Sequence, residues 1–200
     1  VQARGLVGGV KYWDGQFDDA RVALALARTA AAQGALQVNH CPVDGLIHDD
    51  GKVAGVVCQD GETGRLLSVR ARCVVNATGV WVDGVRAMDG DALGHPVRPM
   101  VAPSQGVHLV VDAEFLPGDH ALLVPKTRDG RVLFAVPWMG KLILGTTDTP
   151  RHDLALEPEP FAHEVAFILN ESARYLRRPP RRKDVRSCWV GLRPLVKAAE

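Results

Sequence analysis

The chain has 200 residues, 46% of them hydrophobic, and a formal net charge of +1 at pH 7. This length and composition describe a globular protein with one or two compact units. The near-neutral charge excludes broad electrostatic attraction to nucleic acid, and no apolar run reaches the roughly 20 residues of a transmembrane helix. The four cysteines lack the spacing of metal ligands, so we expect no metal site.

The first part of the chain is predicted to contain strand, helix and strand. Residues 8–12 read as a short β entry. A helix capped by Asp18 or Asp19 runs to about Gln33, with a stripe of mostly alanine side chains that we expect to pack against a sheet. Residues 36–40 follow as the next strand.

Three antiparallel strands are predicted next, at about 43–48, 53–59 and 65–70, separated by turns rich in Asp and Gly. Residues 73–76 are then an apolar run without polar alternation. Such a run is typical of a strand buried on both faces of a parallel sheet.

The break after this strand is the most informative stretch of the sequence. Asn76-Ala77-Thr78-Gly79 places small residues, a hydroxyl and a glycine where a ligand can approach the backbone closely. A short helix can extend from Val80 to Met88, with its free amides directed at the same spot. An ordinary strand–turn–helix connection is an equally good interpretation of these residues.

The second part has the pattern of an antiparallel sheet. An irregular link that contains Pro96, Pro99 and Pro103 comes first. Strands are then predicted at about 107–111, 121–125, 131–137, 141–146 and 185–192. A helix from about 161 to 176 precedes the last strand and buries an apolar stripe.

Three short strings together resemble one known family. They are Asn76-Ala77-Thr78-Gly79 followed by Trp81 and Asp83, Leu144-Gly145-Thr146-Thr147-Asp148, and Gly191-Leu192-Arg193-Pro194-Leu195. Over essentially its whole length, the chain is similar to the FAD-dependent glycerol-3-phosphate dehydrogenases of the D-amino-acid-oxidase-like flavoprotein group. It has no G-x-G-x-x-G loop for the dinucleotide pyrophosphate. We therefore read it as the middle of a longer enzyme, and expect the chain alone to be inactive and to bind FAD weakly.

The resemblance implies a mixed α+β and α/β fold. Residues 1–95 would be part of an FAD-binding, Rossmann-like domain with a three-stranded antiparallel excursion. Residues 96–190 would form an antiparallel-sheet substrate domain with a covering helix, and residues 191–200 would return toward the flavin domain. The cofactor contacts that it implies are Val43, Thr78, Gly79, Trp81 and Gly191. On chemistry alone, Val43 reads equally well as a plain core valine.

His108 stands in an apolar strand, where alternation places it and Val110 on one face. Alone, such a histidine is more often a hydrogen-bonded structural residue. In the family pattern, a histidine here faces the substrate side of the flavin, and alcohol oxidation needs a base for the hydroxyl proton. His108 is therefore the predicted catalytic base.

Substrate contacts are expected at two strand ends. Thr146, Thr147 and Asp148 offer short donors and acceptors, although a turn in which Asp148 bonds its own backbone has the same sequence. Arg193 can clamp a phosphate or carboxylate by two parallel bonds, or form a structural salt bridge. The family pattern places all four residues at the substrate and counts Arg193 with His108 as catalytic.

The implied reaction is oxidation of sn-glycerol 3-phosphate to dihydroxyacetone phosphate with hydride transfer to FAD. A related flavin-dependent amine or amino-acid oxidase, and a non-catalytic folded module, are the alternatives. The resemblance allows a membrane quinone as electron acceptor, with oxygen or another protein still open. The basic run from Arg177 to Lys183 is either a solvated loop or attracted to anionic lipid. We expect a cytoplasmic location, either free or peripheral on the inner face of the cell membrane.

Overall fold

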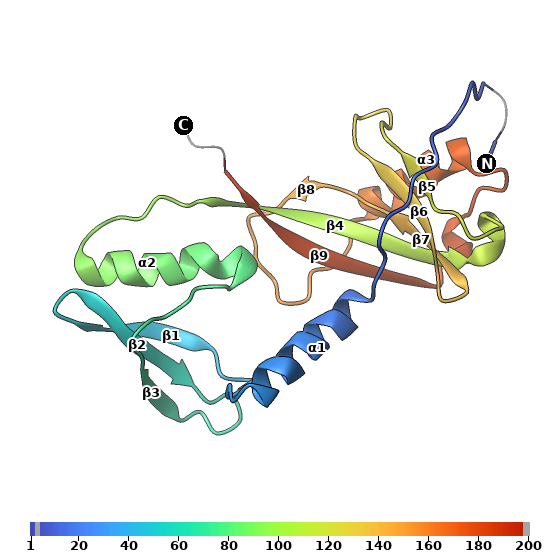
Figure 1. Cartoon of the computed structure of the whole chain (residues 1–200). Helices are drawn as coiled ribbons and strands as arrows, with labels where there is room; N and C mark the ends of the chain where they lie inside the picture. Colours follow the sequence, from blue (N-terminus) through green and yellow to red (C-terminus); the bar gives the residue numbers. More distant parts are fainter. Residues whose placement is uncertain (3–4, 198–200) are drawn as a thin grey trace. The chain divides into compact units, whose positions relative to one another are not determined.

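The structure, a computed structural model, describes residues 1–2 and 5–197. The chain divides into two compact units, whose elements Figure 1 shows. One unit comprises Val1–Val7, Thr78–Asp83 and Arg98–Glu200, and the other comprises Gly8–Ala77 and Gly84–Val97.

The unit built on Gly8–Ala77 holds a helix and a three-stranded meander. Helix α1, Asp19–Ala32, begins where the Asp18 carboxylate accepts a hydrogen bond from the Arg21 backbone N–H at 3.0 Å, which confirms the predicted cap. The meander is antiparallel in the order β1 (Val43–Asp49), β2 (Lys52–Gln59) and β3 (Leu66–Arg70). The predicted three-stranded excursion is therefore confirmed.

Other predictions for this unit are wrong. Residues 8–12, 36–40 and 73–76 do not form strands, and Val75 is 82% exposed instead of buried on both faces. A strand needs a neighbouring strand for its hydrogen bonds, and within the described residues β1, β2 and β3 pair only with one another. No residue of α1 is buried, so the expected packing of its alanine stripe on a sheet is absent too.

The helix predicted after the Asn-Ala-Thr-Gly break is confirmed. A 3-10 turn, η1 (Gly79–Trp81), leads directly into helix α2 (Val82–Leu93). The Asp83 carboxylate accepts hydrogen bonds from the backbone N–H groups of Met100 and Val101, at 3.0 and 2.9 Å. This contact ties Asp83 to the beginning of the strand that follows, within one unit.

The main sheet of the other unit is antiparallel and has six strands. They are β4 (Val101–Asp112), β5 (Leu122–Val124), β6 (Leu133–Trp138), β7 (Lys141–Gly145), β8 (Thr149–Pro150) and β9 (Ser187–Val196). Their order is β5-β6-β7-β4-β8, and β9 pairs with β4 along nearly its whole length (Figure 1). The predicted sheet is confirmed, with two differences. Strand β4 already includes Pro103, which was expected in an irregular link, and β8 was not predicted.

The core of this unit lies on one face of the sheet, under helix α3 (Ala162–Tyr175). Alternate residues of β4 are fully buried there with Ile168 of the helix; they are Val107, Leu109 and Val111. Because side chains alternate along a strand, His108 lies on the opposite face, as predicted. The short 3-10 turns η2 (Ala113–Phe115) and η3 (Arg182–Asp184) lie in the connections.

The buried face of α3 is less apolar than its sequence suggests. Val165, Ile168 and Leu176 are buried as expected, whereas Phe161 is exposed. The polar residues Glu164, Glu171 and Ser172 are buried in the same face. A helix that carries two carboxylates into a core must supply them with hydrogen-bond donors.

Candidate active site

The loop after β7 holds the end of the Arg193 side chain. Nη1 of Arg193 donates to the Thr147 carbonyl at 3.0 Å, and Nη2 donates to the Thr146 hydroxyl at 2.9 Å. Asp148 Oδ1 lies 3.8 Å from Nη1 and accepts a hydrogen bond from the Ser104 hydroxyl. The structure therefore brings together the four residues that were predicted as substrate contacts.

The residue beneath the Arg193 guanidinium is a glycine, Gly106. Arg193 lies opposite Ser104 in the β4–β9 ladder, and its guanidinium reaches over Gly106. A Cβ atom at position 106 would stand 2.2 Å from Nη2 and 2.6 Å from Cζ. Only glycine leaves room for this close approach of the guanidinium, and the Arg193 side chain stays 35% exposed.

His108 lies on the same face of β4, two residues beyond Gly106. Its ring stacks on Trp189 of β9, with ring centroids 5.3 Å apart and an interplanar angle of 17°. The neighbouring strand on the other side, β7, places Gly145 opposite His108, where a Cβ atom would stand 2.3 Å from Cδ2 of the ring. The imidazole is thus fixed between an indole and a glycine.

Helix α3 covers one face of the sheet, whereas the face that carries Arg193 and His108 keeps exposed aromatic side chains. Phe134 and Trp189 remain 39% and 43% exposed on it. An open hollow of about 410 Å³ is lined by Gly130, Arg131, Val132, Phe134, Thr146, Thr147, Asp148, Arg193 and Leu195. The site is therefore a partly apolar surface with a fixed cation at its edge, which suits a planar ligand beside an anionic one.

The five residues predicted as cofactor contacts fall in three places. Thr78, Gly79 and Trp81 lie in and just before η1, where Trp81 Nε1 donates to a backbone carbonyl at 3.3 Å. Gly79 has a φ of 60°, a conformation that favours glycine. Gly191 lies on β9, where an added Cβ would meet no atom within 4 Å. Val43 is the first residue of β1, in the other unit.

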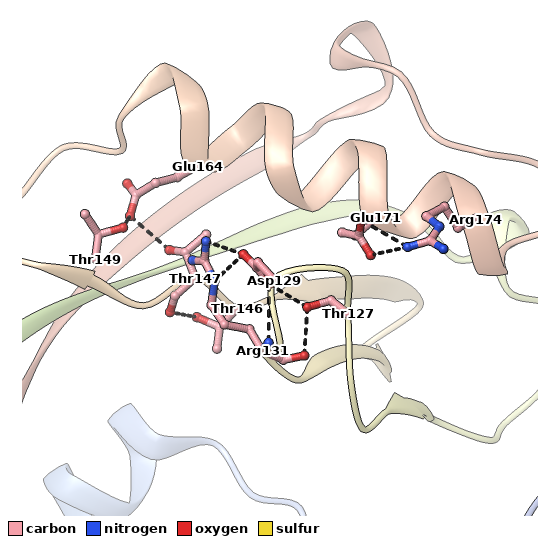
Figure 2. A network of polar contacts seen from close by, with 9 residues as sticks. All are labelled: Thr127, Asp129, Arg131, Thr146, Thr147, Thr149, Glu164, Glu171 and Arg174. Carbon is pink, nitrogen blue, oxygen red and sulfur yellow. Dashed lines mark hydrogen bonds and ion pairs between the residues drawn. The ribbon is translucent and has the colours of Figure 1, made fainter.

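A buried carboxylate behind the loop was not predicted from the sequence. Glu164 Oε1 accepts hydrogen bonds from the hydroxyls of Thr147 at 3.0 Å and Thr149 at 2.6 Å (Figure 2). Its Oε2 accepts from the Gln105 amide at 2.6 Å and from the Phe161 backbone N–H at 2.9 Å. Burial alone raises the pKa of Glu164, but these hydrogen bonds outweigh burial, and the net pKa is below the ordinary value.

Two sequence signals could have pointed to Glu164. It stands three residues after the cap Phe161, which is the capping-box position of a helix. It also lies one turn before Ile168, on the face that enters the core. An amphipathic helix carries many glutamates on its exposed face, so spacing alone does not separate this one from them.

In residues 1–2 and 5–197, no group of three or more His, Cys, Asp and Glu side chains could hold a metal ion. No helix in that part of the chain has the length and apolar character needed to cross a membrane.

Comparison with known protein families assigns this fold and site to a class of flavin-dependent redox proteins. A family model described as FAD dependent oxidoreductase matches residues 1–199, and the chain belongs to that family. It is 45% identical over 195 residues to a probable mitochondrial glycerol-3-phosphate dehydrogenase of Caenorhabditis elegans. It is 44% identical over 204 residues to the mitochondrial glycerol-3-phosphate dehydrogenase of Rattus norvegicus.

These alignments cover 96% and 98% of the chain but only 26% and 27% of the two relatives, so the chain spans about a quarter of their length. The solved glycerol-3-phosphate dehydrogenase from Bacillus halodurans, in complex with FAD, matches with a TM-score of 0.79 and 37% identity. That match covers 90% of this chain and 36% of the other. The resemblance and the mixed α/β fold class are therefore confirmed.

The residues on the open face fit a flavin. Gly191 of β9 lies opposite Gly106 of β4, and an added Cβ at Gly191 would meet no atom within 4 Å, so the surface beside Arg193 and His108 is bare there. The exposed rings of Phe134 and Trp189 flank this area on β6 and β9. A planar ring system can approach such a surface closely.

Proposed function

We propose that this chain is part of a longer enzyme that oxidises sn-glycerol 3-phosphate to dihydroxyacetone phosphate, and that the open sheet face is its substrate site. The observation that carries this proposal is the Arg193 guanidinium, fixed over Gly106 on the face that holds His108. A guanidinium matches the geometry of a phosphate through parallel hydrogen bonds. The relatives named glycerol-3-phosphate dehydrogenase supply the identity of the substrate.

The spacing of the two groups supports a small phosphate ester. Gly106, beneath the guanidinium, and His108 are two residues apart on one strand, which corresponds to about 7 Å. A three-carbon substrate whose phosphate binds Arg193 can therefore present its secondary hydroxyl to His108.

His108 is the proposed base for the hydroxyl proton, because an imidazole is suited to proton transfer near neutral pH. Trp189 and Gly145 hold its ring in one orientation. Thr146 and Asp148 are proposed to orient the substrate beside Arg193, and Thr147 is proposed to do so through its carbonyl, which holds Nη1 of Arg193. FAD, when bound, accepts the hydride. Its proposed contacts in this chain are Val43, Thr78, Gly79, Trp81 and Gly191.

We propose that a membrane quinone is the electron acceptor. We also propose that the enzyme is peripheral on the cytoplasmic face of the cell membrane. The basic run from Arg177 to Lys183 supports attraction to anionic lipid, although Arg178 also bonds Glu114 at 2.9 Å and lies over the Phe115 ring. The relatives compared above carry "mitochondrial" in their names. Fractionation of cells that produce the full-length protein, with quinone and oxygen as competing acceptors, tests these points.

Anaerobic titration of the full-length flavoprotein tests the reaction itself. Glycerol 3-phosphate is expected to bleach the flavin absorbance at concentrations at which glycerol, which lacks the phosphate, bleaches it only slowly. Bleaching by an amino acid but not by glycerol 3-phosphate would favour the amino-acid oxidase alternative, since Arg193 can also bind a carboxylate. Absence of bleaching by glycerol 3-phosphate would overturn the proposed function.

A further inference from the structure

The buried carboxylate of Glu164 connects the core to the loop that holds Arg193. Glu164 is 1% exposed, and all four hydrogen bonds described above end on its two oxygens. Two of the four donors, the hydroxyls of Thr147 and Thr149, come from the segment just after β7. Figure 2 shows the Glu164 side chain reaching from α3 toward both threonines.

The hydrogen bonds of Thr147 have only one consistent direction. The Val107 backbone N–H donates to Thr147 Oγ1 at 3.0 Å, so Oγ1 is already an acceptor. The single hydroxyl proton of Thr147 then points to Glu164 Oε1. Glu164 Oε1 therefore accepts this hydrogen bond, and because Oε2 accepts two more, only a carboxylate satisfies all four donors.

The same threonine reaches the open face through its backbone. The Thr147 carbonyl accepts the hydrogen bond from Arg193 Nη1, and the neighbouring Thr146 hydroxyl accepts from Nη2. Thr147 therefore has its side chain tied to the α3 side of the sheet and its carbonyl tied to the guanidinium on the other side. One residue, Thr147, therefore connects Glu164 with Arg193 by hydrogen bonds.

Helix capping does not account for this arrangement. The capping role of Glu164 uses only the bond from the Phe161 N–H to Oε2. Oε1 contacts the two threonines instead, and Gln105, which donates to Oε2, also accepts a hydrogen bond from Arg151. The carboxylate thus belongs to a buried polar network in which the donor and the acceptor of each hydrogen bond are defined.

We propose that Glu164 is a positioning residue for the substrate site, which through Thr147 holds the Arg193 guanidinium where it binds the phosphate of the substrate. The inference rests on the proposed function for the identity of the anion. It assigns to Glu164 no contact with the substrate.

The test compares Glu164→Gln with Glu171→Gln in the full-length flavoprotein. Glu171 is a matched control, because it is also a buried glutamate of α3, but it pairs with Arg174 at 3.2 Å (Figure 2).

The substitution Glu164→Gln replaces one acceptor oxygen by an NH₂ group, which is a donor. Either the Thr147 hydroxyl or the Gln105 amide then loses its acceptor. We expect kcat/KM for glycerol 3-phosphate to fall about 10- to 100-fold in Glu164→Gln, as for a misplaced binding group. Glycerol, which lacks the phosphate, should be oxidised with little further loss, and Glu171→Gln should keep the wild-type ratio of the two substrates.

Two further variants keep the test decisive. Thr147→Val removes the hydroxyl at nearly constant volume and should show the same selective loss, whereas Thr147→Ser keeps the hydroxyl and should restore most of the activity. If Glu164→Gln does not fold, Thr147→Val carries the comparison. In an Arg193→Lys background, Glu164→Gln should add little loss, because both changes weaken one contact.

Equal losses for glycerol 3-phosphate and glycerol, or no loss in a folded Glu164→Gln or Thr147→Val variant, would overturn the positioning role. A wild-type protein that does not oxidise glycerol 3-phosphate would instead refute the proposed function. In that case a crystal structure of Glu164→Gln decides the inference alone: the Arg193–Thr147 carbonyl bond is expected to be lost, and its retention would refute the inference.

Discussion

Gly106 lies directly beneath the guanidinium of Arg193, so close that a Cβ atom at position 106 would overlap with the guanidinium. The atoms that a methyl group at 106 would meet are the far end of a flexible side chain and not backbone. Gly106→Ala should therefore displace Arg193 while leaving the strand pairing of β4 intact. We expect an increase in KM for glycerol 3-phosphate of about tenfold or more, since a hydrogen bond to a charged group contributes about 1.5–3 kcal/mol.

Steady-state kinetics and the thermal midpoint of the full-length protein check this prediction together. Gly84→Ala is the matched control, because an added Cβ there meets no atom within 4 Å. An unchanged KM in Gly106→Ala would mean that the guanidinium has room elsewhere and that its place over the glycine is not needed for binding.

The sequence predicted the main sheet well because its signals are local. Alternation of apolar residues around His108 placed that ring on the face opposite the core. The strands expected at 36–40 and 73–76 did not form, because an apolar run specifies burial but not a pairing partner.

The candidate site was predictable only in part. The strings around Thr147 and Arg193 indicated the right residues through their resemblance to a family, and the structure adds the hydrogen bonds that join them. Glu164 and Gly106 were missed for different physical reasons. The sequence of a helix does not distinguish a buried glutamate such as Glu164 from an exposed one. The role of a strand glycine such as Gly106 is evident only when the side chain that packs over it is known.

Arg193→Lys should not behave as a conservative substitution. A lysine ammonium cannot bond the Thr147 carbonyl, the Thr146 hydroxyl and a phosphate with the planar geometry of a guanidinium. We expect kcat/KM for glycerol 3-phosphate to fall by an amount equivalent to about 1.5–3 kcal/mol. Glycerol should be affected much less. Parallel losses for both substrates, at unchanged FAD content, would make Arg193 a structural residue.

His108→Ala should reduce turnover more than substrate affinity. A positioned general base typically contributes about 10²–10⁴-fold to the rate, and the stacking on Trp189 shows that the ring is held in place. Anaerobic single-turnover reduction of the flavin by glycerol 3-phosphate measures this step directly. A variant with normal reduction rate and a raised KM would indicate a binding role for His108 instead.

Asp112, at the end of β4, should make the sheet sensitive to acid. Its carboxylate accepts hydrogen bonds from Arg186 at 2.6 and 3.0 Å and from Lys141 at 2.8 Å, so it joins the segment before β9 to the start of β7. These bonds lower the pKa of Asp112 from 3.8 to about 2. A carboxylate whose pKa is lower in the folded state stabilises the fold fully above its ordinary pKa. That stabilisation is lost as the pH falls from 3.8 toward 2.

Asp112→Asn should therefore lower the unfolding midpoint at neutral pH, and the difference from the wild type should shrink as the pH falls through this range. Asp50→Asn, in the turn between β1 and β2, is the control for loss of a surface carboxylate. Unfolding followed by circular dichroism across the acid range measures both differences. Because Arg186 and Lys141 are partly exposed, added salt should also reduce the effect at neutral pH. A difference between Asp112→Asn and the wild type that stays constant down to the lowest pH would show that the two ion pairs do not hold β4, β7 and the segment before β9 together.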